Sequence, residues 1–172
     1  QTSAGAAVSR AMAVCEFKGK FAASMDMVVP GGTDLDRLII IGAGDEKALK
    51  SHEWIRLGGA AAAKFSAGSA VTISLELPAG HAGAENAADF ALGALLRSYA
   101  FDKYKTKKPE GESEKKDKSV KVTIMTADPA AAKKAFASRL AVAGGVTLAR
   151  DLVNEPANIL GTLEFTAAAK AL

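Results

Sequence analysis

Asp128-Pro-Ala-Ala-Ala-Lys-Lys-Ala-Phe136 opens the longest helix that the sequence predicts, and Asn154-Glu-Pro-Ala-Asn158 closes it. Asp128 is a good N-cap because its carboxylate can accept hydrogen bonds from the free N–H groups of the first turn. Pro129 suits the first helical position, where a backbone N–H is not needed. Pro156 disfavours the helical conformation for the residue before it, so the helix should end there. The stretch therefore predicts roughly 25 residues of helix, which is long for a single domain.

The two halves of this helix place their apolar residues on different sides. A helix that is apolar on two sides is normally covered on two sides. We therefore interpret it as a connector, whose start belongs to the preceding domain and whose end belongs to a second part of the protein. Gly144-Gly145 costs about 1 kcal/mol per glycine relative to alanine, so we expect another element to pack closely there. The first stripe is Ala132, Phe136, Leu140 and Ala143, with Lys133, Lys134 and Arg139 facing water; the second half carries Val142, Val146, Ala149 and Val153 on one side and Ala141, Leu148 and Leu152 on another.

The residues after Pro156 predict the beginning of a further helix. Gly161-Thr162 is a suitable start, and Glu164 in the first turn is favoured by the helix dipole. Phe165, Ala168, Ala169 and Leu172 then follow at helical spacing, and the sequence ends inside this pattern. We expect the chain to be a fragment of a longer protein.

Composition and cysteine content are those of a globular protein. The chain has 172 residues, of which 49% are hydrophobic and 24% charged, enough for one domain with a core. No apolar run approaches a membrane span and no secretory signal is recognisable, so no membrane partner is expected. Cys15 is the only cysteine and is expected to be a small buried hydrophobe. Its isolation favours a cytoplasmic location.

The positive net charge comes from one segment. Residues 101–121 contain eight lysines and five acidic residues, which accounts for the whole net charge of +3. The interleaved acids and Pro109-Glu-Gly111 favour an exposed loop over a folded basic face. DNA contact through the lysine-rich loop 103–121 is retained as an alternative. Tyr99, Phe101 and Tyr104 precede the loop and are interpreted as packing residues of the core and of a helix end.

Strands and helices alternate along the chain, which predicts an α/β fold. Arg37-Leu-Ile-Ile-Ile-Gly42 is the clearest strand, a short apolar run typical of the buried middle of a parallel or mixed sheet. We expect a three-layer α/β/α arrangement with a mixed, mostly parallel sheet. Small residues around Gly58 should let a helix approach that sheet closely. Strands are expected over 25–29, 37–42, 71–76 and 120–125, and helices over 4–13, 46–65, 82–99 and from 128 onward.

The motifs that could carry chemistry are weak. Gly42-Ala-Gly44 follows a strand, but Lys47 stands where a dinucleotide-binding pattern needs its third glycine. Pro30-Gly-Gly-Thr-Asp34 is more typical of a turn than of a phosphate cradle. His52 has no second histidine four residues later, since Arg56 is there, and His81 is expected in a solvated loop. We therefore predict no catalytic, metal-binding or cofactor-binding residue in this chain.

Ala149-Arg-Asp-Leu-Val-Asn-Glu-Pro-Ala-Asn-Ile-Leu160 closely resembles the domain-junction signature of leucyl aminopeptidases, also called cytosol aminopeptidases. Further similar pieces occur in the family's order, so the resemblance spans nearly the whole chain. They are Phe17-Lys-Gly-Lys20, Asp36-Arg-Leu-Ile-Ile-Ile-Gly42, Leu57-Gly-Gly-Ala60 and Leu95–Lys108.

The resemblance implies a macro-domain-like, non-catalytic N-terminal domain over residues 1–153 and the truncated start of a catalytic domain over 154–172. It implies a parent enzyme that is a cytoplasmic homohexamer, binds two divalent metals (manganese or zinc), and removes N-terminal residues from peptides. This fragment alone should be inactive and bind no metal. A macro-like fold leaves an ADP-ribose-binding module as an alternative. The residues expected to position the two domains are Arg150, Asp151, Asn154, Glu155, Pro156 and Asn158.

Overall fold

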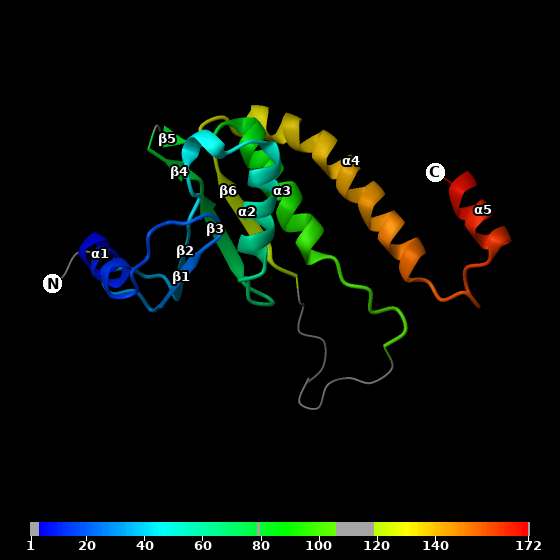
Figure 1. Ribbon diagram of the computed structural model, residues 1–172, viewed down its shortest axis with the longest axis horizontal. Coiled ribbons are helices and arrows are strands. Elements are labelled where there is room, and N and C mark those ends of the chain that lie inside the picture. The colour runs from blue at the N-terminus through cyan, green and yellow to red at the C-terminus, as the bar shows by residue number, and fades with distance from the viewer. Residues whose placement is uncertain (1–3, 79, 106–118, 172) are drawn as a thin grey trace.

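The computed structural model describes residues 4–78, 80–105 and 119–171. It has the predicted alternation of strands and helices, and the α/β class is confirmed (Figure 1). The helices are α1 (Ala4–Val14), α2 (Ser51–Ala62), α3 (Ala84–Ser98), α4 (Pro129–Asn154) and α5 (Thr162–Lys170), and the strands are β1 (Ser24–Val28), β2 (Arg37–Ile41), β3 (Ala70–Ser74), β4 (Glu76–Leu77), β5 (Gly80–His81) and β6 (Lys121–Met125).

The strands pair two by two in the described residues. β3 and β6 are parallel, whereas β1 pairs antiparallel with β2 and β4 antiparallel with β5. This differs from the mostly parallel sheet that the alternation predicted. The reason is local, because residues 29–36 turn the chain straight back and a short connection can join only antiparallel neighbours. The expected turn at Pro30–Asp34 is the one that does this.

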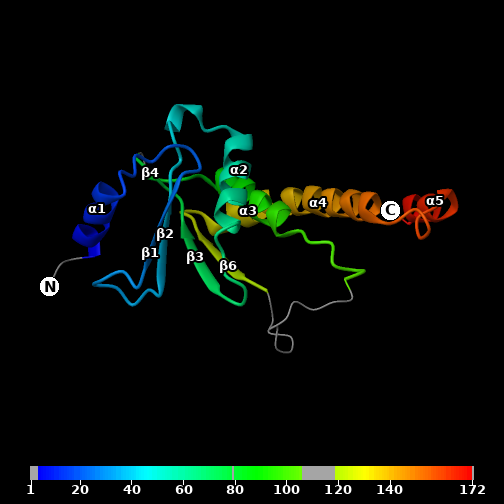
Figure 2. The ribbon, with the colours of Figure 1, turned by 60° about the horizontal axis from the view of Figure 1, so that its bottom comes forward.

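The strands lie between two layers of helix. Figure 2 shows α1 on one side of the strands and α2 with α3 on the other. The core forms where α2 and α3 meet and cover the strands. Its buried residues are Trp54, Leu57 and Ala61 of α2, Ala87 and Phe90 of α3, and Leu75 and Ala82 of the β4–β5 region.

α2 and α3 cross in direct backbone contact. A Cβ built on Gly58 would lie 1.9 Å from the carbonyl oxygen of Phe90, and one built on Gly93 would lie 1.8 Å from that of Ile55. The sequence placed small residues around Gly58 correctly on an inward face, but the close neighbour is another helix and not the sheet.

The helix expected over 46–65 is divided. A short 3-10 turn, Glu46–Ala48, precedes α2, and the Asp45 carboxylate caps it by accepting from Lys47 N at 3.0 Å. The α2 helix then starts afresh, with the Glu53 carboxylate accepting from Lys50 N at 3.1 Å. Two local caps close together explain why one periodic pattern becomes two elements.

α4 has the predicted ends. Asp128 Oδ1 accepts from Ala131 N at 2.9 Å, Pro129 occupies the first position, and the helix runs for 26 residues. It starts beside α3 and extends away from the strands toward α5 (Figure 1). The predicted start of α5 is also present, since Glu164 Oε2 accepts from Gly161 N at 3.0 Å.

One expectation about α4 was wrong, and a second is not met within the described chain. Arg139 does not face water, because its Nε donates to Asp89 Oδ1 of α3 at 2.8 Å. Asp89 is only 4% exposed and also accepts from Ser51 Oγ at 2.6 Å, so this contact joins three helices. Gly144 and Gly145 have no close neighbour in the described chain, since a Cβ on either would meet no atom within 4 Å.

Candidate functional site

Four of the six residues expected to position the domains lie on the last turns of α4 and contact the segment after α3. They are Arg150, Asp151, Asn154 and Glu155, and Glu155 is the C-cap of the helix. Pro156 and Asn158 lie in the exposed turn that comes next, where the Pro156 carbonyl accepts from Ile159 N and Leu160 N. We call the contacts between Leu96–Tyr104 and Arg150–Glu155 the junction network.

Tyr99 makes the first group of contacts in the junction network. Its hydroxyl donates to Asp151 Oδ1 at 2.8 Å and accepts from Asn154 Nδ2 at 3.0 Å. The Arg150 guanidinium lies 4.7 Å from the centre of the Tyr99 ring, and its Nη1 donates to the Leu96 carbonyl at 2.8 Å. The end of α3 is thus joined to α4 by a cation–π contact and by hydrogen bonds that include a charged partner.

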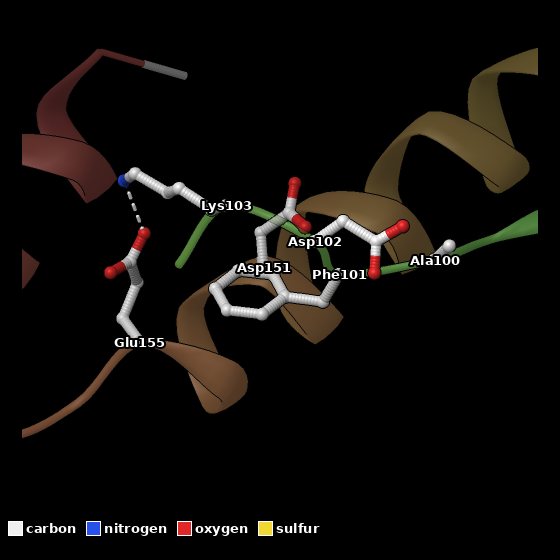
Figure 3. A pocket seen from close by; sticks show the side chains of 6 residues that line it. All are labelled: Ala100, Phe101, Asp102, Lys103, Asp151 and Glu155. Carbon is white, nitrogen blue, oxygen red and sulfur yellow. Dashed lines mark hydrogen bonds and ion pairs between the residues drawn. The ribbon is translucent and has the colours of Figure 1, made fainter. Parts of the chain in front are cut away.

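Glu155 makes the second group of contacts in the junction network. Lys103 Nζ lies 2.5 Å from Glu155 Oε1, and the Tyr104 hydroxyl donates to the second carboxylate oxygen. Figure 3 shows the Lys103 side chain reaching Glu155 at the end of α4. The Glu155 side chain is only 11% exposed, whereas that of Lys103 is 58% exposed. Both carboxylate oxygens of this nearly buried glutamate are therefore bound by one segment, through Lys103 and Tyr104.

The contacts shift the pKa values of the groups involved. The hydrogen bonds from Lys103 and then Tyr104 lower the pKa of Glu155, and the same partnership raises the pKa of Lys103. A carboxylate with a lowered pKa stabilises the fold above its ordinary pKa, and this contribution is lost as pH falls through the lowered value. A lysine with a raised pKa contributes below its ordinary value and loses this as pH rises through the raised one. The ion pair is therefore complete across the neutral range.

We expect Lys103→Met to raise the pKa of Glu155, because the substitution removes the nearest positive charge and hydrogen-bond donor. The measurement is an NMR titration of the Glu155 side-chain carboxyl carbon, which should titrate below an ordinary glutamate in the unsubstituted chain. Lys105→Met is the control, since Lys105 pairs with Asp102 inside its own segment. An unchanged Glu155 midpoint in Lys103→Met would contradict the assigned contact.

A shallow cavity of about 440 Å³ adjoins the junction network. It is lined by Ala100, Phe101, Asp102, Lys103, Asp151 and Glu155 (Figure 3). Its carboxylates do not form a metal centre, and no group of three His, Cys, Asp or Glu side chains suited to a metal ion occurs within residues 4–78, 80–105 and 119–171. The predicted absence of metal ligands from the whole chain stays a prediction.

The other candidate motifs have structural explanations. The Gly42-Ala-Gly44 loop packs against the loop before β1, since a Cβ on Gly42 would lie 2.3 Å from the Lys20 carbonyl oxygen. Gly44 N also donates to Gly19 O at 3.0 Å. This close packing accounts for the glycines without a nucleotide. Thr33 Oγ1 donates to the Pro30 carbonyl at 2.8 Å and closes the other glycine turn on itself.

The histidines and the cysteine belong to different elements of the fold. His52 contacts the neighbouring Glu53, and His81 lies on β5, 3.5 Å from Glu76. Cys15 is exposed, so its expected burial was wrong; it lies just after α1, which buries none of its residues. Most of the lysine-rich loop 103–121 lies outside the described residues. Among the described segments, no helix is long and apolar enough to cross a membrane.

Sequence reasoning missed the roles of Tyr99, Lys103 and Tyr104. It interpreted both tyrosines as packing residues, whereas their hydroxyl groups bind the end of α4. Their partners lie about 50 residues away along the chain, and no spacing rule links positions so distant. The nearest signal was that Leu95–Lys108 and Ala149–Leu160 both resemble the same family.

Comparison with known proteins finds a matching family model and several close relatives. Residues 1–108 match the model of the cytosol aminopeptidase family, N-terminal domain. A probable cytosol aminopeptidase of Rhizobium rhizogenes is 52% identical over 165 residues, and one of Sinorhizobium fredii is 51% identical over 163 residues. Each alignment covers 95% of this chain but 33% of the relative, so the chain spans about a third of the length of its curated relatives.

Two solved structures share the fold. A mutant of tomato leucine aminopeptidase superposes with a TM-score of 0.76 at 25% identity, covering 97% of this chain and 32% of that one. The bottromycin maturation enzyme BotP, in complex with Mn, gives a TM-score of 0.69 at 23% identity over 93% of this chain and 32% of its own. The second likeness is one of fold alone.

Proposed function

Because the chain belongs to the cytosol aminopeptidase family and matches its N-terminal domain, we propose that it is the non-catalytic domain of a metal-dependent aminopeptidase. In this proposal residues 1–153 form the domain, and residues 154–172 begin a catalytic domain supplied by the remaining two thirds of the protein. The domain helps to assemble the oligomer, a homohexamer, and shapes access to the active site. The parent removes N-terminal residues from peptides in the cytoplasm.

The observation that carries this proposal is the uncovered apolar surface at the end of the chain. Val153 is 85% exposed, Leu163 is 79% exposed and Phe165 is 52% exposed. Large apolar side chains left exposed on two consecutive helices are typical of an interface. Gly144 and Gly145 lie just before this surface with open space beside them. A catalytic domain packed there would cover both features.

The metal chemistry is assigned to the catalytic domain. Two divalent ions, manganese or zinc, would polarise the scissile carbonyl and activate a water molecule there. The described residues of this chain provide no ligand set for such ions. Arg150, Asp151, Asn154, Glu155, Pro156 and Asn158 act in positioning and not in the reaction.

We expect the 172-residue chain to show no hydrolysis of leucine-p-nitroanilide with manganese or zinc. Fusion of this chain to the C-terminal two thirds of the Rhizobium rhizogenes relative should give metal-dependent hydrolysis, because the fusion supplies the catalytic domain at a matching junction. The relative's C-terminal two thirds alone is the control and should be less active or less soluble. Turnover by a clean preparation of the 172-residue chain would contradict the proposal.

A further inference from the structure

We infer that the segment Tyr99–Tyr104 is a clamp that fixes the rotation of the end of α4 and the direction in which the chain leaves it. The inference rests on the proposed function in one respect, since the object being positioned is the catalytic domain. In the clamp, Tyr99, Lys103 and Tyr104 hold the end of α4, although they lie outside the junction signature. These are positioning residues and not catalytic ones.

The contacts of the clamp all come from one side of α4. Successive residues of an α-helix are about 100° apart, so Arg150, Asp151, Asn154 and Glu155 lie within one arc of roughly 140°. Each of the four contacts the end of α3 or the residues just after it. A helix held at four positions along one arc cannot rotate about its axis without breaking those contacts.

The opposite side of the same turns is apolar and uncovered. Val146 is 37% exposed and Val153 is 85% exposed, and Ala149 between them is also exposed. At helical spacing these residues form one stripe that faces away from the clamp. The clamp therefore decides which way the apolar stripe points, and the stripe is the surface that the catalytic domain would cover.

The clamp is needed because the second half of α4 has few other neighbours in the described chain. Ala143 is the only residue of α4 that the described parts of the protein bury. Beyond it, Gly144 and Gly145 have open space beside them, and glycine pairs weaken a helix. Without an attachment near residue 155, the helix could bend at these glycines and its last turn could fray. The Lys103–Glu155–Tyr104 contact lies at the last residue before Pro156, where such fraying would begin.

The clamp can be tested on the 172-residue chain by distance measurement between two spin labels. We place the labels at Lys47→Cys in the body and Lys170→Cys in α5, in a Cys15→Ser background, and measure distances by double electron–electron resonance. The triple variant Tyr99→Phe, Lys103→Met, Tyr104→Phe removes the polar groups but keeps the bulk of each side chain. Its distance distribution should be at least about twofold broader than that of the parent, since the end of α4 can then open locally.

Two controls separate the clamp from general damage. Asp102→Asn with Lys105→Met breaks an ion pair inside the same segment and should leave the distribution unchanged. The charge exchange Lys103→Glu with Glu155→Lys should narrow the distribution relative to Lys103→Glu alone. Far-UV circular dichroism confirms that helix content is equal. A triple variant that folds and keeps the parent width would overturn the clamp, as would equal broadening in the control.

The distance measurement tests the clamp and involves no catalytic step. An inactive fusion protein would refute the proposed function and leave the distance result standing. A triple variant with unchanged distances would refute the clamp and leave the hydrolysis result standing.

Discussion

Gly58→Ala and Gly93→Ala should each lower the free energy of unfolding by at least about 3 kcal/mol, at the upper end of the cost of overpacking. The added methyl group would lie within 2 Å of a backbone carbonyl oxygen of the facing helix in both cases. Rotation of a side chain cannot relieve such a clash, because the atom encountered belongs to the main chain. The helices would have to separate, and Trp54, Leu57 and Phe90 at their interface would lose contact with one another.

Urea unfolding followed by circular dichroism measures this loss, and the chain contains matched controls. Gly59→Ala places its methyl group 3.6 Å from the Gly93 carbonyl oxygen, an ordinary contact, on the same helix. Gly144→Ala meets open space and should stabilise the chain by about 1 kcal/mol through helix propensity alone. A fall in stability for Gly58→Ala no larger than for Gly59→Ala would show that the helices do not cross this closely.

The same Gly144 substitution distinguishes the isolated chain from the longer fusion protein. If the catalytic domain packs against this part of α4, the added methyl group is favourable in the isolated chain and unfavourable in the fusion. The sign of the effect then reports whether the space beside Gly144 is filled by the rest of the protein.

The features that the sequence predicts well are those determined by neighbouring residues. Asp128 and Pro129 start α4, Pro156 ends it, and Gly161 with Glu164 starts α5, because each of these signals acts within one helical turn. Strand β2 is likewise present where its apolar run predicts it. The assignment of residues 149–160 to a domain junction came from resemblance to a family and from no local rule, and it stays a prediction.

The features that the sequence did not predict depend on distant partners. Arg139 was expected to face water because it lies outside the apolar stripe of the first half of α4, but Asp89 of α3 lies within reach. The close approach at Gly58 was attributed to the sheet, because the apolar pattern of one helix does not identify the element that packs against it. The pairing of strands two by two depends on connection geometry more than on the composition of each strand.

Arg139→Met should lower the free energy of unfolding by about 2 to 4 kcal/mol, because it leaves the carboxylate of Asp89 covered and without its cationic partner. Asp89 is 4% exposed, and the Arg139 side chain is 25% exposed, so the pair is well shielded from water on one side. The hydrogen bond with Asp89 raises the pKa of Arg139, so the guanidinium is charged at neutral pH. Thermal and urea unfolding measure the loss, with Lys133→Met, an exposed residue of the same helix, as the control.

A double-mutant cycle shows whether the loss comes from the pair itself. Asp89→Leu with Arg139→Met should cost less than the sum of the two single substitutions, because the double variant leaves no buried charge unpaired. The second partner of Arg139, Glu85, is 69% exposed and stays solvated when the arginine is removed. Ser51 also donates to Asp89, so the carboxylate connects the start of α2, the middle of α3 and the first half of α4. Additive losses in the cycle would show that α4 is held on α3 by apolar packing alone. A coupled loss would show that this ion pair fixes the base of the connector, whose far end is held by Glu155.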